Sequence, residues 1–234
     1  MRFSRLVVAA LLASSTAIAT ESQAPTIELP TTEKPIVRVG GDREVQATWD
    51  ADDAAWRSGS STIDTPLPEG YPAPTPPGAI ELKIYPAVRR AEITENGANN
   101  DGGFWPLFNH IKRRDIAMTS PVEMDYASDR EWTMSFLYRR AEQGPVGSDA
   151  KDPRVVVRDA EPLMVVSLGG RGSYDRSRID ADLQTLREWL KENPQLVEAG
   201  SPRALMYNGP SILWGRKWLE VQLPVKPAEP APAE

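Results

Sequence analysis

The sequence predicts an α+β fold, an antiparallel sheet or distorted β-barrel with two α-helices packed outside it. Alternating apolar and polar residues, the period of a half-buried strand, recur through residues 79–223. Two stretches of the same region instead carry apolar residues at helical spacing. The order strand, amphipathic helix, strand, strand occurs twice, and nothing in it implies a run of parallel crossovers.

The first half opens with "AIELKIYPAVRRAEI" (79–93), where apolar residues alternate with polar ones up to Tyr85. Pro86 then indicates a bulge or a sheet edge. A helix is predicted over "GGFWPLFNHIKRR" (102–114), and Pro106 suits its first turn. Its apolar stripe consists of Phe104, Leu107, Phe108 and Ile111.

Two strands complete the first half, one in "IAMTSPVEMDY" and one in "EWTMSFLYRR". In the second half, "RVVVRDAEPLMVVSLGG" (154–170) predicts extended chain that divides about Glu161 and Pro162. "SRIDADLQTLREWLKEN" (177–193) predicts the second helix, which Pro194 ends. "RALMY" and "KWLEVQL" are the last two strands, on either side of an Asn-Gly-Pro turn.

The N-terminus predicts export. In residues 1–19, two arginines precede the apolar run "LVVAALLASSTAIA", and Ala17 and Ala19 form a small-residue cleavage site. The run is shorter than the roughly 20 residues that span a bilayer, so we expect a cleaved signal peptide, no integral membrane span afterwards, and a periplasmic or secreted protein.

Two further segments lie outside the predicted domain of residues 79–223. Residues 20–78 are rich in Pro, Thr, Ser and acids, and we expect a Pro-rich linker or arm. Within it, residues 36–41 are expected to form a short strand and residues 44–56 a short helix. Residues 224–234, "PVKPAEPAPAE", are expected to be a disordered tail.

Composition excludes several classes of protein. The formal charge is -6, and removal of residues 1–19 takes away two arginines and makes it -8, which argues against a nucleic-acid partner. The absence of Cys excludes disulfides, Cys-ligated zinc, iron–sulfur clusters and covalently attached haem. One His cannot build a His-rich metal site, and no G-x-S-x-G motif supports a serine hydrolase.

The single histidine, His110, lies about 110° from the centre of the first helix's apolar stripe, which is a boundary position. A histidine there can border a groove and ligate a metalloporphyrin, or it can cap a solvated helix end. In a chain without Cys it is the strongest candidate for an iron ligand, with the Met and Tyr residues as alternatives.

Basic residues cluster at the ends of the predicted elements. They can line one rim and hold a carboxylate ligand, or they can only compensate helix dipoles and face solvent. These residues are Arg89, Arg90, Lys112, Arg113, Arg114, Arg139, Arg140, Arg216 and Lys217.

Four motifs together resemble the SOUL haem-binding family, in the family's order. They are "IELKIYPAVRRAEI", "GGFWPLFNHIKRRDIAMTSPVEM", "VVVRDAEPLMVVSLGGRGSY" and "YNGPSILWGRKWLEVQL". The resemblance implies a pseudo-symmetric, distorted antiparallel β-barrel flanked by two α-helices, similar to the fold of the GyrI-like ligand-binding domains. It also implies non-covalent binding of haem or a related tetrapyrrole in an apolar groove beside the first helix, with basic side chains near the propionates.

Carried over position by position, the resemblance gives eight binding candidates and no catalytic residue. They are Phe104, Leu107, Phe108, His110, Ile111, Lys112, Arg113 and Met118, with His110 also the candidate metal ligand. One departure is the closing motif: the family tends to read "RRNEVW" and this chain reads "GRKWLEV", which weakens any role for Arg216.

Three functions follow as hypotheses. The first is an exported tetrapyrrole-binding protein, not an enzyme, that sequesters or transports haem. The second is a small-molecule-processing enzyme like the GyrI-like hydrolases, which requires Glu81, Glu92 or Glu123 inside the groove with a raised pKa. The third is a cell-envelope interaction module whose Pro-rich arm binds a protein partner that the sequence does not identify.

Overall fold

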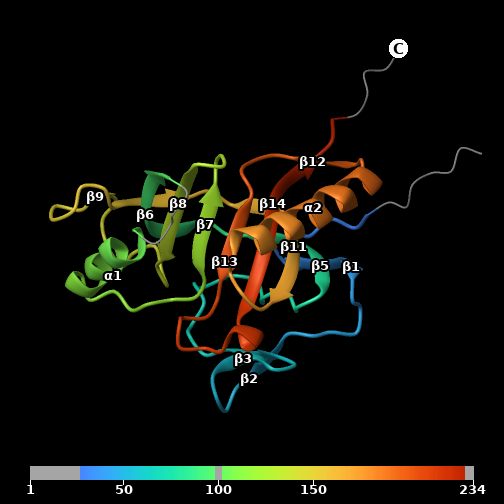
Figure 1. Cartoon of the computed structure of the whole chain (residues 1–234), viewed down its shortest axis with the longest axis horizontal. Coiled ribbons are helices and arrows are strands. Elements are labelled where there is room, and N and C mark those ends of the chain that lie inside the picture. The colour runs from blue at the N-terminus through green and yellow to red at the C-terminus, as the bar shows by residue number, and fades with distance from the viewer. Residues whose placement is uncertain (1–26, 98–101, 230–234) are drawn as a thin grey trace, which may run out of the picture.

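The computed structural model describes residues 27–97 and 102–229, so the predicted signal peptide lies outside the described residues. The structure contains a large sheet and a small sheet (Figure 1). The small sheet consists of β2 (Thr48–Asp50), β3 (Ala55–Ser58) and β4 (Ser61–Ile63). The large sheet consists of β1 (Ile36–Gly41), β5 (Ala79–Tyr85), β6 (Val88–Asn96), β7 (Val122–Tyr126), β8 (Glu131–Leu137), β9 (Gly147–Ser148), β10 (Val156–Ala160), β11 (Leu163–Arg171), β12 (Leu196–Glu198), β13 (Arg203–Met206) and β14 (Trp218–Pro227). The helices are α1 (Phe104–Arg113), α2 (Arg176–Glu192) and the short 3-10 turn η1 (Trp214–Arg216).

The large sheet has the strand order β1-β5-β11-β14-β13-β7-β8-β6-β10-β9, and β12 pairs with β14 beside this path. Its neighbouring strands are antiparallel, as in the central pair of β13 and β7. The α+β class, with a large antiparallel sheet and two helices, is confirmed. In the described part of the chain β1 and β9 are the two edges, so the sheet is open and the predicted barrel is not confirmed.

The order of strands is symmetric about the β13–β7 pair. Outward from it lie β14, β11 and β5 on one side, and β8, β6 and β10 on the other. The three inner strands of each side come from one sequence unit, β11-α2-β13-β14 or β6-α1-β7-β8, with β12 inserted in the second-half unit. The next strands outward are exchanged between the sides, because β5 precedes β6 in the chain and β10 precedes β11. The repeated order of elements seen in the sequence therefore produces a sheet built from two matching halves.

Both helices pack on the same face of the sheet through their apolar stripes. Leu107 and Ile111 of α1 and Leu183 and Leu186 of α2 join one hydrophobic cluster with the strand residues of that face. α1 packs mainly against β6 and β8, and α2 against β14 and β11. The central pair, β7 and β13, is left between the two helices.

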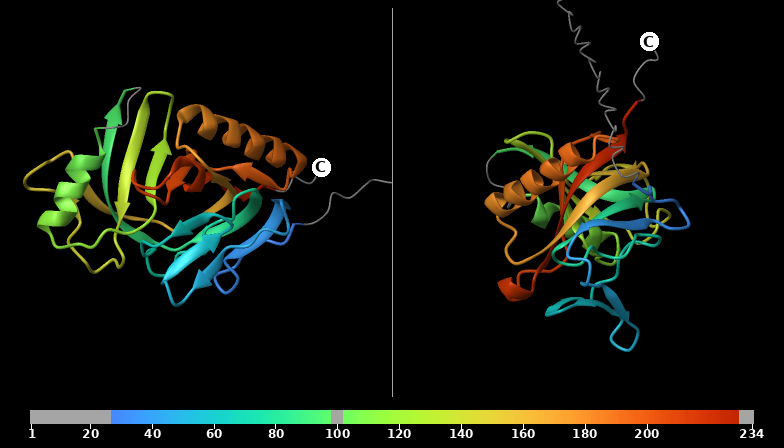
Figure 2. Two further views of the ribbon diagram at one scale, coloured as in Figure 1. Left: turned by 60° about the horizontal axis from the view of Figure 1, so that its bottom comes forward. Right: turned by 90° about the vertical axis from the view of Figure 1, so that its right-hand side faces the viewer.

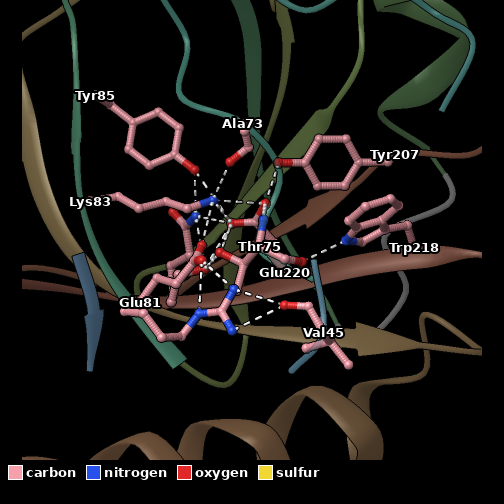
Figure 3. A network of polar contacts seen from close by, with 12 residues as sticks. Val45, Ala73, Thr75, Glu81, Lys83, Tyr85, Tyr207, Trp218 and Glu220 are labelled. Atoms are coloured by element: carbon pink, nitrogen blue, oxygen red, sulfur yellow. Dashed lines mark hydrogen bonds and ion pairs between the residues drawn. The ribbon is translucent and has the colours of Figure 1, made fainter. Parts of the chain in front are cut away.

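The opposite face of the sheet is polar and also buried. Strand β5 was predicted to be half buried, yet Glu81 and Lys83 on its polar side are 5% and 0% exposed. The cover is the Pro-rich segment, residues 64–78, which crosses this face (Figure 3). The buried carboxylate of Glu220 accepts from the Thr75 backbone N–H at 2.7 Å, and the Lys83 ammonium donates to the Ala73 carbonyl at 2.7 Å.

The structure corrects the prediction that residues 20–78 are a linker or free arm. Within the described part of this range, β1 pairs with β5 as an edge strand, and the Pro-rich segment forms part of the protein's interior. Proline suits this position because each proline lacks the N–H that would otherwise need a buried acceptor.

Two smaller predictions are also corrected. Residues 44–56 contain no helix; β2 and β3 form a hairpin, which with β4 makes a small sheet that projects from the body (Figure 2). Asp50 favours the turn because its carboxylate accepts from the N–H groups of Asp52 and Asp53. The predicted disordered tail begins too early, since β14 continues to Pro227, which pairs with Leu196 of β12. Residues 230–234 lie outside the described residues.

Among the described helices, none is long and apolar enough to span a bilayer.

Candidate functional site

A groove of about 1330 Å³ opens over the central pair of strands, where neither helix covers the apolar face of the sheet. One wall is α1, the other is formed by the start of α2 and the loop that joins β13 to β14. The apolar residues whose side chains belong to this face and line the groove are Phe104, Trp105, Phe108, Met118, Val122, Tyr126, Trp132, Met134, Tyr174, Met206 and Trp214.

The α1 wall is an aromatic cluster. The rings of Phe104 and Phe108 are stacked with their centroids 6.0 Å apart, one helical turn from each other, and Trp105 meets both edge-on. The helix approaches the sheet closely because Gly103 has no side chain; a Cβ there would lie 3.0 Å from Ile93. Trp105 is 64% exposed, so this wall presents a large apolar surface to the groove mouth.

The second wall carries the cations of the groove. Arg176 lies 4.7 Å above the ring of Tyr126 and pairs with Asp180 at 2.8 Å. Lys217 lies 5.0 Å from the ring of Tyr174 and forms no salt bridge within residues 27–97 and 102–229. The groove therefore offers a neutralised guanidinium and an ammonium that is free to meet an anionic group.

Tyr174 fixes the second wall to the sheet. Its hydroxyl donates to the Trp218 carbonyl at 3.0 Å and accepts from the Asn208 N–H at 2.9 Å. Burial raises the pKa of Tyr174, so the phenol stays protonated at neutral pH. The ring beneath Lys217 is thus held in place before any ligand binds.

The side chain of His110 lies outside the groove, in a buried cluster on the side of α1 that faces away from the groove. Its side chain is 0% exposed; Nδ1 is 2.7 Å from the Asp149 carboxylate and Nε2 is 2.8 Å from the Tyr138 hydroxyl. Burial raises the pKa of Tyr138 to about 12, so its hydroxyl keeps the proton that it can donate to Nε2. Both ring nitrogens are therefore used within the fold.

Asp149 is the centre of this cluster. Burial alone raises the pKa of its carboxyl group, but bonds from the Lys151 N–H, the His110 ring and the Arg113 guanidinium bring the pKa well below its usual range. The ionised carboxylate accepts from Nδ1–H of His110, because a carboxylate can only accept. These bonds tie α1 to the turn that follows β9.

The groove and the fold around it coincide with one known family. Residues 71–224, more than half of the chain, match the SOUL heme-binding protein family. The chain belongs to this haem-binding family. Haem is the cofactor that this membership assigns, and the SOUL domain, residues 71–224, includes the last part of the Pro-rich segment as well as both helices.

Solved structures resemble the SOUL domain at the level of fold. The crystal structure of the EcmrR C-terminal domain has a TM-score of 0.51 at 14% identity, over 64% of this chain and 98% of that one. EcmrR in its cryo-EM complex with DNA has a TM-score of 0.53 at 13% identity, over 64% of this chain and 57% of that one. A hydrolase from Listeria innocua has a TM-score of 0.49 at 14% identity, over 66% and 94%. No curated protein matches the chain at a significant level.

The eight binding residues predicted for the SOUL domain separate into three places. Phe104, Phe108 and Met118 line the groove. Leu107 and Ile111 lie beneath α1 in the core. The others lie on the far side of α1: His110 in its buried cluster, Arg113 on Asp149, and Lys112 in solvent.

Sequence reasoning missed most of the groove. Tyr126, Trp132 and Met134 were not among the predicted binding residues, because the groove is the uncovered part of the same apolar strand face that packs against the helices. Alternation cannot distinguish a strand side chain that meets a helix from one that meets a groove. Lys217 was among the basic candidates, whereas Arg176 and Trp105 were not singled out.

The three glutamates required by the enzyme hypothesis lie on the polar face of the SOUL domain, away from the groove. Glu123 pairs with Arg203 at 3.2 Å, and Glu81 pairs with Arg38 at 3.0 Å. Glu92 is 2.6 Å from Arg158. Each of these carboxylates is therefore paired with a guanidinium, and Glu92 also lies 2.8 Å from the half-buried Arg90.

Proposed function

We propose that the chain is an exported protein that binds haem or a related tetrapyrrole non-covalently in the groove, and that it sequesters or transports this ligand. The observation that carries the proposal is the aromatic groove over β7 and β13, with Lys217 in its second wall. Family membership supports a haem-type ligand, and the predicted signal sequence supports export.

The groove suits the shape and charge of a porphyrin, a large flat apolar body with two carboxylates. Stacked Phe104 and Phe108 offer a flat apolar wall, and Lys217 offers a positive charge to a propionate. The volume of about 1330 Å³ exceeds the ~300–1000 Å³ typical of sites for drug-sized ligands, as a larger ligand requires.

The donors in the lining restrict how iron can be held. The lining contains no His, and burial raises the pKa of Tyr126 to about 12, which disfavours a phenolate. The thioethers of Met118, Met134 and Met206 remain as neutral donors. Bound haem would supply a redox-active iron, while the residues of the groove bind and orient the ring.

Ligation by His110 is a separate prediction with a definite structural requirement. The imidazole would have to give up its hydrogen bond to Asp149 or Tyr138 and reach the groove from the opposite side of α1, the helix that carries it. We therefore propose that apolar contact carries most of the affinity. Iron-free protoporphyrin IX should then bind within about tenfold of hemin, whereas a strong axial ligand would favour hemin by much more.

Hemin titration of the full chain tests the function. We expect a saturable shift of the Soret band at micromolar protein, and roughly tenfold weaker binding by Trp105→Ala and Phe108→Ala because each loses a large stacking surface. Trp49→Ala is the matched control, since Trp49 is 51% exposed and lies outside the groove. Absence of a saturable shift would refute the proposal.

A further inference from the structure

The loop between β13 and β14 differs in charge from the rest of the chain. We call residues 208–217, "NGPSILWGRK", the basic loop. The sequence has no Asp or Glu from residue 199 to residue 219, although the whole chain has a formal charge of -6. The basic loop contributes Arg216 and Lys217 and therefore concentrates positive charge on an acidic protein.

The tip of the basic loop is apolar and exposed. Leu213 is 72% and Trp214 is 75% exposed, the two highest values among the large exposed apolar residues of the described chain. Leu213 does not line the groove, and Trp214 contacts it with only part of its surface. Ligand binding in the groove therefore leaves most of this apolar surface unexplained.

The base of the loop is rigid, so the tip stays outside. The Asn208 side chain accepts from the Trp218 N–H at 2.7 Å and donates to the Thr62 carbonyl at 2.7 Å, which ties both ends of the loop to β4 and β14. The turn η1 then holds Leu213 and Trp214 away from the core. An exposed Trp and Leu on a fixed base lose little conformational entropy on binding a surface.

We propose that the basic loop docks the protein on a lipid bilayer that contains anionic headgroups. Trp prefers the boundary between headgroups and acyl chains, where its ring is buried and its N–H stays hydrated. Leu213 would enter the acyl boundary beside it, and Arg216 would meet the lipid phosphates. Since residues 199–219 contain no Asp or Glu, the loop itself adds no repulsion from anionic headgroups, unlike most of this acidic chain.

Docking would place the groove mouth against the bilayer. Trp214 belongs to both the exposed tip and the groove lining, and Trp105 on the opposite wall is also exposed. If the proposed function holds, an apolar tetrapyrrole passes between the bilayer and the groove without crossing water. Docking itself does not depend on that ligand and is tested in its absence.

The test uses the lack of Cys in the chain. Leu213→Cys in the full chain carries a single environment-sensitive fluorophore, and vesicles of equal parts phosphatidylglycerol and phosphatidylcholine are added at low salt. We expect a blue shift with at least a twofold rise in intensity as the label enters the bilayer. The label reports position 213 alone, so lipid affinity elsewhere in the chain does not produce the signal.

The matched control is Val197→Cys with the same label. Val197 is a 39% exposed apolar residue of β12, which pairs with the far end of β14, about 30 Å from the basic loop. Its emission should not change. No change at position 213, or an equal change at both positions, would overturn the proposal.

Charge is tested with Arg216→Glu in the labelled Leu213→Cys chain, because Arg216 does not line the groove. Binding to the anionic vesicles should weaken roughly tenfold, and pure phosphatidylcholine should bind the unaltered loop more weakly than the mixed vesicles do. Equal binding to both lipids would overturn the anionic part of the proposal. Hemin titration of Arg216→Glu should be unchanged, so failure of docking and failure of ligand binding are distinguishable.

Discussion

His110 shows how the role of one side chain depends on the residues that fold around it. As the only histidine, on a helix beside the groove, it was the strongest candidate for an iron ligand. In the structure it joins α1 to Asp149 and Tyr138, and all three residues are buried. The helical spacing indicated a boundary position, but the partners come from residues 28 and 39 positions away in sequence, which periodicity does not reveal.

Removal of the imidazole should destabilise the fold. His110→Ala leaves a cavity and two buried polar groups without their partner, and we expect a loss of roughly 2–4 kcal/mol in the free energy of unfolding. Tyr138→Phe, which removes one hydroxyl and leaves the pair with Asp149, should lose about 1 kcal/mol. Urea denaturation measures both. A shifted Soret band in His110→Ala bound to hemin would instead assign the residue to the iron.

Asp125 should make stability depend on pH. Burial, together with the charge of Glu123, raises the pKa of Asp125 to about 6, so the folded protein holds a proton that the unfolded chain releases near pH 4. Stability from this group is complete below pH 4 and is lost as pH rises through about 6. Asp125→Asn should therefore gain roughly 1–2 kcal/mol over the parent between pH 4 and pH 8, measured by urea unfolding.

Asp159 provides a control of opposite sign. A hydrogen bond from Arg89 lowers the pKa of Asp159, so its contribution is present at neutral pH and is lost as the pH falls. Asp159→Asn should lose stability relative to the parent as pH rises from 3 to 7. Equal pH profiles for the two variants would contradict the assignment of the Asp125 shift.

At the level of elements, the Pro-rich segment packs directly against strand β11 at Gly169. The Thr75 and Pro76 carbonyls approach Gly169 so closely that a Cβ there would overlap both oxygens, and Pro77 forms a parallel bridge with the same glycine. Gly169→Ala should displace the segment and cost several kcal/mol, measured by thermal or urea unfolding. Gly209→Ala is the control: a Cβ there meets no atom within 4 Å and should change stability by less than about 0.5 kcal/mol.

The buried ion pair beneath that segment should show strong coupling. Lys83 and Glu220 are both fully buried and 3.1 Å apart; despite burial, Lys83 and the Tyr207 hydroxyl help to lower the pKa of Glu220 to about 2. Lys83→Met leaves an unpaired buried charge and should cost about 3–5 kcal/mol. Lys83→Met with Glu220→Gln should recover much of this loss, and additive losses in the double-mutant cycle would show that the pair is not coupled.

Most regular elements could be predicted from the sequence, and the exceptions have physical causes. The two separate strands on either side of Pro162 and the stripe of α2 follow from local spacing. The β2–β3 hairpin was taken for a helix because its alanines favour helix, whereas Asp50 caps a turn and Ala54 adopts a φ of 49°. The Pro-rich segment has the composition of a linker. Its burial could not be predicted, because it depends on Glu220 and Trp218, which lie far away in the chain.

For the whole molecule, the two matching halves explain where the groove lies. Each half places its helix on its own outer strands, so the seam between halves, β7 and β13, is the part of the apolar face that no helix covers. The repeated pattern made the halves predictable. The family resemblance implied a groove beside the first helix, but its extent across the seam could not be predicted, because it depends on the distance between the two helices.

The contribution of residues 27–78 to the sheet edge and to the cover of the polar face gives a prediction for the domain boundary. A chain that starts at residue 79, the predicted start of the domain, loses both β1 and the cover of the polar face. Glu220 and Lys83 would then lose their bonds to Thr75 and Ala73. We expect residues 79–229 to lack cooperative thermal unfolding and residues 27–229 to retain it, measured by circular dichroism. Equal transitions in both would show that the cover is dispensable.

The hydrogen bonds between Thr75 and Glu220 also bear on when the protein can fold during its synthesis. They join residues 145 positions apart, and the segment that contains Thr75 leaves the ribosome long before its partner strand. The polar face cannot close until β14, nearly the last part of the chain, has been synthesised. We expect folding to finish only after synthesis and to be slow, as for other topologies dominated by distant contacts, so the proposed export would act on a chain whose polar face is still open.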